Sequence, residues 1–188
     1  MVRRKYLAVD EQVAEEVFRA ARSKGMTLFS YTTELLRESL DIERSYMRLK
    51  EAKECLEAFL LAKELGFTLV PEYLVARLVN KASPQEVRKL SEEAGNICGR
   101  YFMLKKGASD PIQLLEEAAK KLLWGVTELV VKEGDNEFSV TCILSLRERN
   151  YAEAIAGFIT GFLRAFAYRP VRLDVSKGMA TVLFEQAV

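Results

Sequence analysis

The chain begins with a short strand-like segment that has no pairing partner nearby in the sequence. Residues 3–9 read Arg-Arg-Lys-Tyr-Leu-Ala-Val, an alternating and basic stretch. Leu7 and Val9 share one face of such a strand, and Arg4 and Tyr6 share the opposite face. An isolated strand leaves its backbone N–H and C=O groups unpaired. Because the next segments are helical, we expect this strand to pair with the same strand of a second chain.

Two amphipathic helices are predicted directly after the strand. Asp10 suits the N-cap of the first helix, and Gly25 suits the left-handed residue that ends it. The apolar face of that helix holds Val13, Val17, Phe18 and Ala21. Thr27 or Ser30 can cap the second helix. The inner face of the second helix holds Leu28, Tyr31, Leu35, Leu36 and Leu40.

This strand, helix, Gly-Met-Thr-Leu turn and second helix resemble the Arc/MetJ/CopG ribbon-helix-helix family of DNA-binding dimers. The resemblance implies a homodimer whose two-stranded ribbon enters the major groove of double-stranded DNA. It places Arg4 and Tyr6 at base edges, and it leaves Arg3 nearer the phosphates. Ala8 departs from the family pattern, because a long polar residue is usual at that position. We therefore expect fewer contacts to base edges than in a typical member of the family.

The resemblance also implies a phosphate site at the start of the second helix. Thr27, Leu28 and Phe29 would form it, because helix N-termini offer N–H groups and the positive end of the dipole to an anion. Charge restricts the DNA contact to one place. Residues 1–45 hold eight basic and eight acidic side chains, and the whole chain has a net charge of +1. The excess of positive charge lies at residues 3–5, where the ribbon would meet DNA.

Two less specific readings of this region stay open. A basic N-terminus followed by two amphipathic helices is also compatible with an ordinary helical domain. The ribbon could equally serve assembly alone, in a dimeric scaffold or partner-binding protein that does not bind DNA.

The composition argues against an enzyme and against a resident cofactor. The chain has no histidine, which removes the usual general base, the histidine metal ligand and the Ser-His or Cys-His nucleophile. Its three cysteines, Cys55, Cys98 and Cys142, are too scattered for a Cys₄ zinc site, and their odd number favours reduced thiols. No signal peptide is visible before the first charged residues, so we expect a cytoplasmic protein without a membrane partner.

The middle of the chain, residues 46–84, is predicted to be a helical linker. Apolar residues continue at helical spacing as far as Gly66, and Ile42, Leu49 and Leu56 are seven residues apart. This spacing fits either a short intermolecular coiled coil over residues 42–60 or a helix packed on its own chain. Pro71 then suits the start of a short helix that ends near Asn80.

Residues 85–188 are predicted to form an α+β domain. Ser83-Pro84 opens a helix to about Phe102, and Asp110-Pro111 opens another to Leu123. Two hairpins follow, the first with strands at 126–133 and 137–146, the second with strands at 171–175 and 179–184. Between the hairpins, Asn150 should cap a long apolar helix, residues 151–168, which Arg169-Pro170 should end. Glu153 and Arg164 lie inside that helix, so it does not read as a membrane span.

This order of elements resembles the 4-vinyl-reductase-type domain, a relative of the transport-particle (TRAPP) fold. The residues that carry the likeness are Leu90–Gly95 and Gly99-Arg100, then Gly157–Leu163, and finally Arg169–Val171. The resemblance implies a small-molecule sensor domain or a dimerising scaffold, often built around an apolar pocket. Many sensor members ligate zinc through cysteines near the long helix and in the last hairpin, but this chain has none there, so no zinc is expected.

If such a pocket exists, its wall should include Phe102, Cys142, Phe158 and Phe162. Each of them individually is better explained as ordinary core packing. Together these observations predict an α+β protein with three parts: a ribbon-helix-helix domain at 1–45, a helical linker at 46–84 and a ligand-binding or dimerisation domain at 85–188. The predicted function is that of a homodimeric transcriptional regulator, with the dimeric scaffold as the main alternative.

Overall fold

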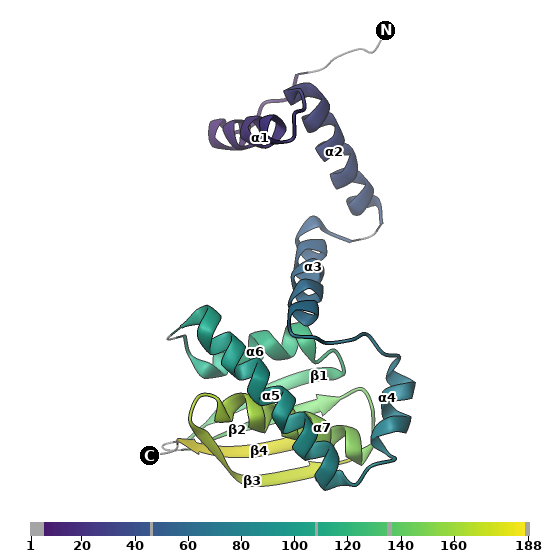
Figure 1. Cartoon of the computed structure of the whole chain (residues 1–188), viewed down its shortest axis with the longest axis vertical. Coiled ribbons are helices and arrows are strands. Elements are labelled where there is room, and N and C mark those ends of the chain that lie inside the picture. The colour runs from purple at the N-terminus through teal and green to yellow at the C-terminus, as the bar shows by residue number, and fades with distance from the viewer. Residues whose placement is uncertain (1–5, 46, 108, 135–136, 187–188) are drawn as a thin grey trace. The chain divides into compact units, whose positions relative to one another are not determined.

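A computed structural model describes residues 6–45, 47–107, 109–134 and 137–186 of the 188-residue chain (Figure 1). Arg3 and Arg4 therefore lie outside the described residues. The chain divides into two compact units, Met1–Leu56 and Glu57–Val188, with helix α3 (Leu49–Glu64) spanning the division. The protein is of the α+β class, with its strands in one antiparallel sheet.

The N-terminal unit contains the predicted pair of helices, α1 (Glu11–Ser23) and α2 (Leu28–Arg44). The Asp10 carboxylate accepts the N–H of Gln12 at 2.9 Å and caps α1 as predicted. Of the two candidate caps for α2, the structure uses Thr27, whose hydroxyl accepts the Ser30 N–H at 3.1 Å. Gly25 has a φ of +67°, the left-handed conformation expected of the residue that follows α1. Residues 6–10 form neither helix nor strand within the single chain.

Five helices precede or interrupt the sheet of the C-terminal unit. After α3 come α4 (Glu72–Val79), α5 (Pro84–Lys106), α6 (Pro111–Leu122) and, between the two hairpins, α7 (Arg149–Arg164). A full capping box starts α5, because the Ser83 hydroxyl accepts the Glu86 N–H while the Glu86 carboxylate accepts the Ser83 N–H. The helix predicted to end near Phe102 continues one turn further, to Lys106.

The prediction that Asn150 caps α7 is wrong. The N-cap is Glu148, and Asn150 lies within the first turn. Its side-chain amide instead donates to the carbonyl oxygens of Val79 at 2.8 Å and Ala82 at 3.0 Å. Asn150 therefore ties α7 to the end of α4 and to the loop that follows it, a tertiary role that the local sequence could not indicate. The helix also ends earlier than predicted, at Arg164.

The sheet has the strand order β1-β2-β4-β3, with every neighbouring pair antiparallel. The strands are β1 (Val126–Glu133), β2 (Glu137–Leu144), β3 (Tyr168–Ser176) and β4 (Met179–Gln186). Arg169 and Pro170, predicted to lie before the third strand, belong to it. The proline is accommodated because β3 is an edge strand, and the register of the β3–β4 pair shifts between Pro170 and Arg172, as in a β-bulge.

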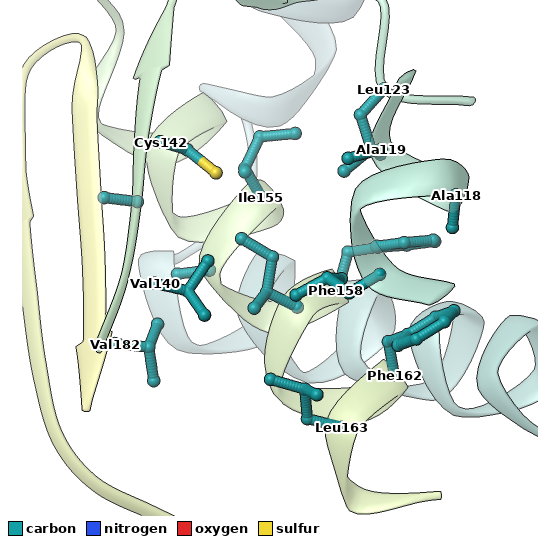
Figure 2. Close-up of a cluster of buried hydrophobic side chains, with 14 of the residues drawn as sticks. Ala118, Ala119, Leu123, Val140, Cys142, Ile155, Phe158, Phe162, Leu163 and Val182 are labelled. Atoms are coloured by element: carbon teal, nitrogen blue, oxygen red, sulfur yellow. The ribbon is translucent and has the colours of Figure 1, made fainter. Parts of the chain in front are cut away.

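Helix α7 is the centre of the C-terminal unit. It packs on β3 and β4 on one side and along α5 on the other, so the unit is layered as sheet, α7 and α5 (Figure 1). All residues from Ile155 to Leu163 are buried. Figure 2 shows Val140, Cys142 and Val182 of the sheet directed toward α7, with α6 on the opposite side.

Glycines allow α5 and α7 to approach each other closely. A Cβ added at Gly95 of α5 would overlap the carbonyl oxygen of Phe158, and one added at Gly161 of α7 would overlap that of Glu92. The backbones of the two helices are therefore in direct contact at these points. Among the residues that the structure describes, no helix is long and apolar enough to cross a membrane.

Candidate nucleic-acid interface and small-molecule groove

The first turn of α2 gathers three of the residues predicted to contact DNA: Thr27, Leu28 and Phe29. Leu28 and Phe29 are exposed. The Thr27 hydroxyl is occupied in capping Ser30, so its contribution is to fix the start of the helix. N–H groups in the first turn of an α-helix lack carbonyl partners four residues earlier, which suits them to bind an anion. Tyr6 is fully exposed, while the positions of Arg3 and Arg4 lie outside the described part of the chain.

Without residues 3–5, the N-terminal segment is acidic. Residues 6–45 hold five basic and eight acidic side chains. The basic Lys24 lies near the α1–α2 turn, where its ammonium group is 5.0 Å from the centre of the Tyr31 ring. If this segment binds DNA, the attraction to phosphate has to come mainly from the three basic residues that precede Tyr6.

The apolar residues of the two N-terminal helices are largely uncovered. Ala21 is the one buried residue among those described in this unit, and α2 has none along its 17 residues. The exposed apolar residues of the two helices are Val13, Phe18, Leu28, Phe29, Leu35, Leu36, Leu40 and Ile42. A groove of about 490 Å³ runs along α1, lined by Glu11, Ala14, Glu15, Phe18 and Arg19. The apolar face that the sequence predicts is present, and the described residues of its own unit do not cover it.

The four residues predicted to line a ligand pocket lie in the packed core. Phe102, Cys142, Phe158 and Phe162 are each no more than 5% exposed. The Phe102 and Phe162 rings meet edge to face, with their centres 5.7 Å apart. None of the four lines either of the two grooves described for this protein. Their burial supports ordinary core packing for each of the four side chains.

A different groove lies between α6 and the edge strand β1, with a volume of about 470 Å³. This volume is within the usual range for small-molecule sites. Its lining residues are Glu116, Ala119, Lys120, Leu123, Trp124, Val126, Thr127, Glu128 and Leu129. The Trp124 ring is exposed, and its indole N–H donates to the Lys121 carbonyl at 2.9 Å, which fixes the ring at the groove.

The groove was missed because its residues come from the end of a helix and from the start of the strand that follows, and no local pattern shows that the two elements leave a groove between them. An exposed tryptophan at a helix-to-strand junction was the one available signal. Aromatic and aliphatic side chains beside a few polar groups can hold a small apolar molecule with one polar end.

The thiol of Cys55 is exposed, whereas several other groups that could carry chemistry are buried or paired. Burial raises the pKa of Cys98 and of Cys142 to about 12, so both thiols stay protonated at neutral pH. The buried carboxylate of Glu153 lies 3.6 Å from Arg88 and 3.8 Å from Arg149. The pKa of Tyr151 is raised mainly by burial of its side chain and, to a smaller extent, by the negative charge of Glu72. Among the described residues, no group of three or more His, Cys, Asp or Glu side chains is placed to hold a metal ion.

Comparison with known proteins does not assign the chain to a family. No protein-family model matches it, and no curated protein matches it. Solved structures of H-NOX domains share a limited likeness. An oxygen-binding H-NOX domain related to soluble guanylate cyclases is 12% identical, with a TM-score of 0.41 over 66% of this chain and 81% of that chain. An H-NOX structure from work on heme distortion is 14% identical, with a TM-score of 0.38 over 66% and 80%. Likenesses this low carry no conclusion about cofactor or function.

Proposed function

We propose that this protein is a homodimeric, DNA-binding transcriptional regulator. In this proposal the N-terminal unit forms a ribbon-helix-helix dimer on DNA. The C-terminal unit, of the 4-vinyl-reductase or TRAPP type, senses a small apolar ligand or strengthens the dimer. One observation carries the proposal: a well-capped pair of helices leaves almost its whole apolar face uncovered.

Dimerisation follows from the energetics of that face. Isolated helices of this length are marginal in water, and most of their stability in proteins comes from packing an apolar face. Here each chain supplies the face without a core to receive it. Two copies can cover one another, and the same association gives the strand at residues 3–9 an antiparallel partner. The requirements of the strand and of the helices are therefore met by one partner, a second copy of the chain.

The DNA contacts divide into two kinds in this proposal. Arg4 and Tyr6 face outward on the ribbon and read base edges, each presented twice by the two-fold symmetry. Arg3 and the first turn of α2 bind phosphates and set the position of the ribbon on the duplex. The 6–45 segment is net acidic, so base and phosphate contacts both depend on the basic residues that open the chain.

For ligand sensing, the groove between α6 and β1 is the best-supported site. It is open, is lined by both apolar and polar side chains, and contains the exposed Trp124 ring. A ligand bound there would contact α6 and β1 together. Through these elements it would change the freedom of the linker helices, and with it the spacing of the two ribbons.

The proposed dimer is tested by introducing a charged side chain on the apolar face of α2. Leu36→Glu places a charge on that face and should weaken the full-length dimer, which is measured by sedimentation equilibrium. Leu36→Met keeps the site apolar at a similar volume and should leave the dimer intact. A wild-type protein that is monomeric at every concentration would contradict the proposal.

DNA binding is tested by selection from random duplex DNA at two salt concentrations. Arg4→Ala should cost about 1–3 kcal/mol per contact and relax preference at one base pair in each half-site. Arg3→Ala should weaken binding to all sequences alike and reduce the salt dependence.

A dimeric scaffold that does not bind DNA is the second candidate. The acidic balance of residues 6–45 favours it, because that charge opposes approach to a polyanion. Wild-type protein with no DNA affinity beyond a Kd of about 10⁻⁴ M at low salt would establish this alternative in place of the regulator.

A further inference from the structure

The solvent-facing side of α5 carries a stripe of apolar residues that its own unit leaves uncovered. Leu90 is 65% exposed, Ile97 64% and Leu104 86%. They are seven residues apart, so they lie in one line along the helix. Ala94, which is exposed, and Tyr101, which is half-buried and donates its hydroxyl to Glu64 of α3 at 2.6 Å, fall between them at the alternating spacing of three and four residues that defines a coiled-coil seam. Since α7 covers the opposite side of α5 through Gly95 and Gly99, the seam faces away from the core.

We infer that this seam is a second homodimer interface, in which the α5 helices of two copies pack antiparallel. It deepens the proposed homodimer by giving the C-terminal units their own contact, and it uses none of the residues of the N-terminal unit. The two-fold axis crosses the helix between Gly95 and Asn96. Leu90 then lies opposite Tyr101 of the second copy, and Ala94 lies opposite Ile97 of the second copy.

Charge complementarity supports this occupant and this register. Glu93 and Arg100, both exposed, flank the seam on one side. In the antiparallel register just described, Glu93 faces Arg100 of the second copy, and the symmetry repeats the pair. A shift of one heptad in one direction would bring Arg100 against Arg100, and a shift in the other would bring Glu93 against Glu93. Like charges at such positions disfavour both shifted registers.

The parallel arrangement is also disfavoured by charge. In a parallel pair, Arg100 of one copy would lie beside Lys105 of the other, a cation that is already paired with Glu64 of its own chain at 3.1 Å, so Arg100 would gain no partner of opposite charge. The antiparallel pair avoids this contact. A surface that is complementary to itself only under a two-fold rotation fits a second copy of the same chain better than an unrelated partner.

The test is a charge exchange in the full-length chain carrying Leu36→Glu, so that association through the N-terminal unit does not mask the seam. This protein should remain a dimer by sedimentation equilibrium. Glu93→Arg or Arg100→Glu should each raise its dimer Kd by about ten-fold or more, because each creates two like-charged contacts. The double variant Glu93→Arg/Arg100→Glu restores opposite charges and should return the Kd to within about three-fold of the starting protein.

A second pair of variants tests the apolar contacts of the seam. Ile97→Asp should dissociate the Leu36→Glu protein, whereas Lys89→Asp, a charge change at an exposed position off the seam, should not. Circular dichroism checks that every variant keeps its helices. A Leu36→Glu protein that is wholly monomeric would overturn the inference, as would single and double charge variants with the same Kd. Failure of the N-terminal dimer appears separately, since Leu36→Glu would then leave the association of the wild-type chain unchanged.

Discussion

Replacing Gly161 by alanine should be among the most destabilising small substitutions in this protein. The added Cβ would overlap the Glu92 carbonyl oxygen and lie 2.8 Å from the Asn96 backbone nitrogen, where ordinary contact begins at 3.4 Å. Both neighbours are backbone atoms of α5, so no side chain can rotate away. The two helices must separate instead.

The magnitude follows from that separation. A gap of about 0.5–1 Å forfeits a quarter to a half of the dispersion attraction between the surfaces it divides. Overpacking of this kind costs about 3 kcal/mol, the upper end of the usual range. Alanine offsets about 1 kcal/mol through its higher helix propensity. The net loss in the free energy of unfolding should therefore be about 2 kcal/mol, measured by urea denaturation followed by circular dichroism.

Gly66→Ala is the matched control. Gly66 follows α3 in the same unit with a φ of +77°, and a Cβ there would meet nothing within 4 Å. The N–H groups of Gly66 and Phe67 donate to the carbonyl oxygens of Lys63 and Ala62, the pattern of a left-handed residue that ends a helix, so the substitution carries only the strain of a left-handed alanine, about 1 kcal/mol. The close-packing argument is refuted if Gly161→Ala costs no more than Gly66→Ala.

Three further outcomes are expected. A thiol reagent at pH 8 should modify Cys55 alone in the native protein and all three cysteines in denaturant. The reason is that Cys55 is exposed, while burial raises the pKa of Cys98 and Cys142 to about 12. Early modification of a second thiol in the native protein would contradict this. Phe162→Ala should cost about 3–5 kcal/mol in urea unfolding, since the ring is fully buried, and a loss below about 1 kcal/mol would argue against the packing. Asn150→Ala should cost about 1–3 kcal/mol by removing two hydrogen bonds to backbone carbonyls, and an unchanged midpoint would show that they contribute nothing.

Local elements were predictable because their signals are local. Asp10 and Thr27 mark helix starts through side chains that reach N–H groups two or three residues away. Gly25 marks a helix end through a backbone conformation that few other residues adopt. The same reasoning located β1 at 126–133 and the turn before β4.

Asn150 and Pro170 show where such reasoning stops. Asparagine before an apolar run is a good cap, but here its amide binds carbonyls some 70 residues away in sequence, a distance that no local pattern encodes. Proline normally interrupts a strand, yet β3 lies at the edge of the sheet with a register shift that accepts it. Edge position is a property of the whole sheet.

By itself, the sequence determined the alternation of apolar and polar residues, and with it the class of each element and the faces that need cover. Only the tertiary structure decided which of those faces are covered. The side chains of Phe102, Cys142, Phe158 and Phe162 became core because α7 lies between the sheet and α5. The apolar faces of α2 and α5 have the same local pattern, yet they remain exposed. Periodicity requires a partner for an apolar face, but the packing of the chain determines whether that partner lies within the same molecule.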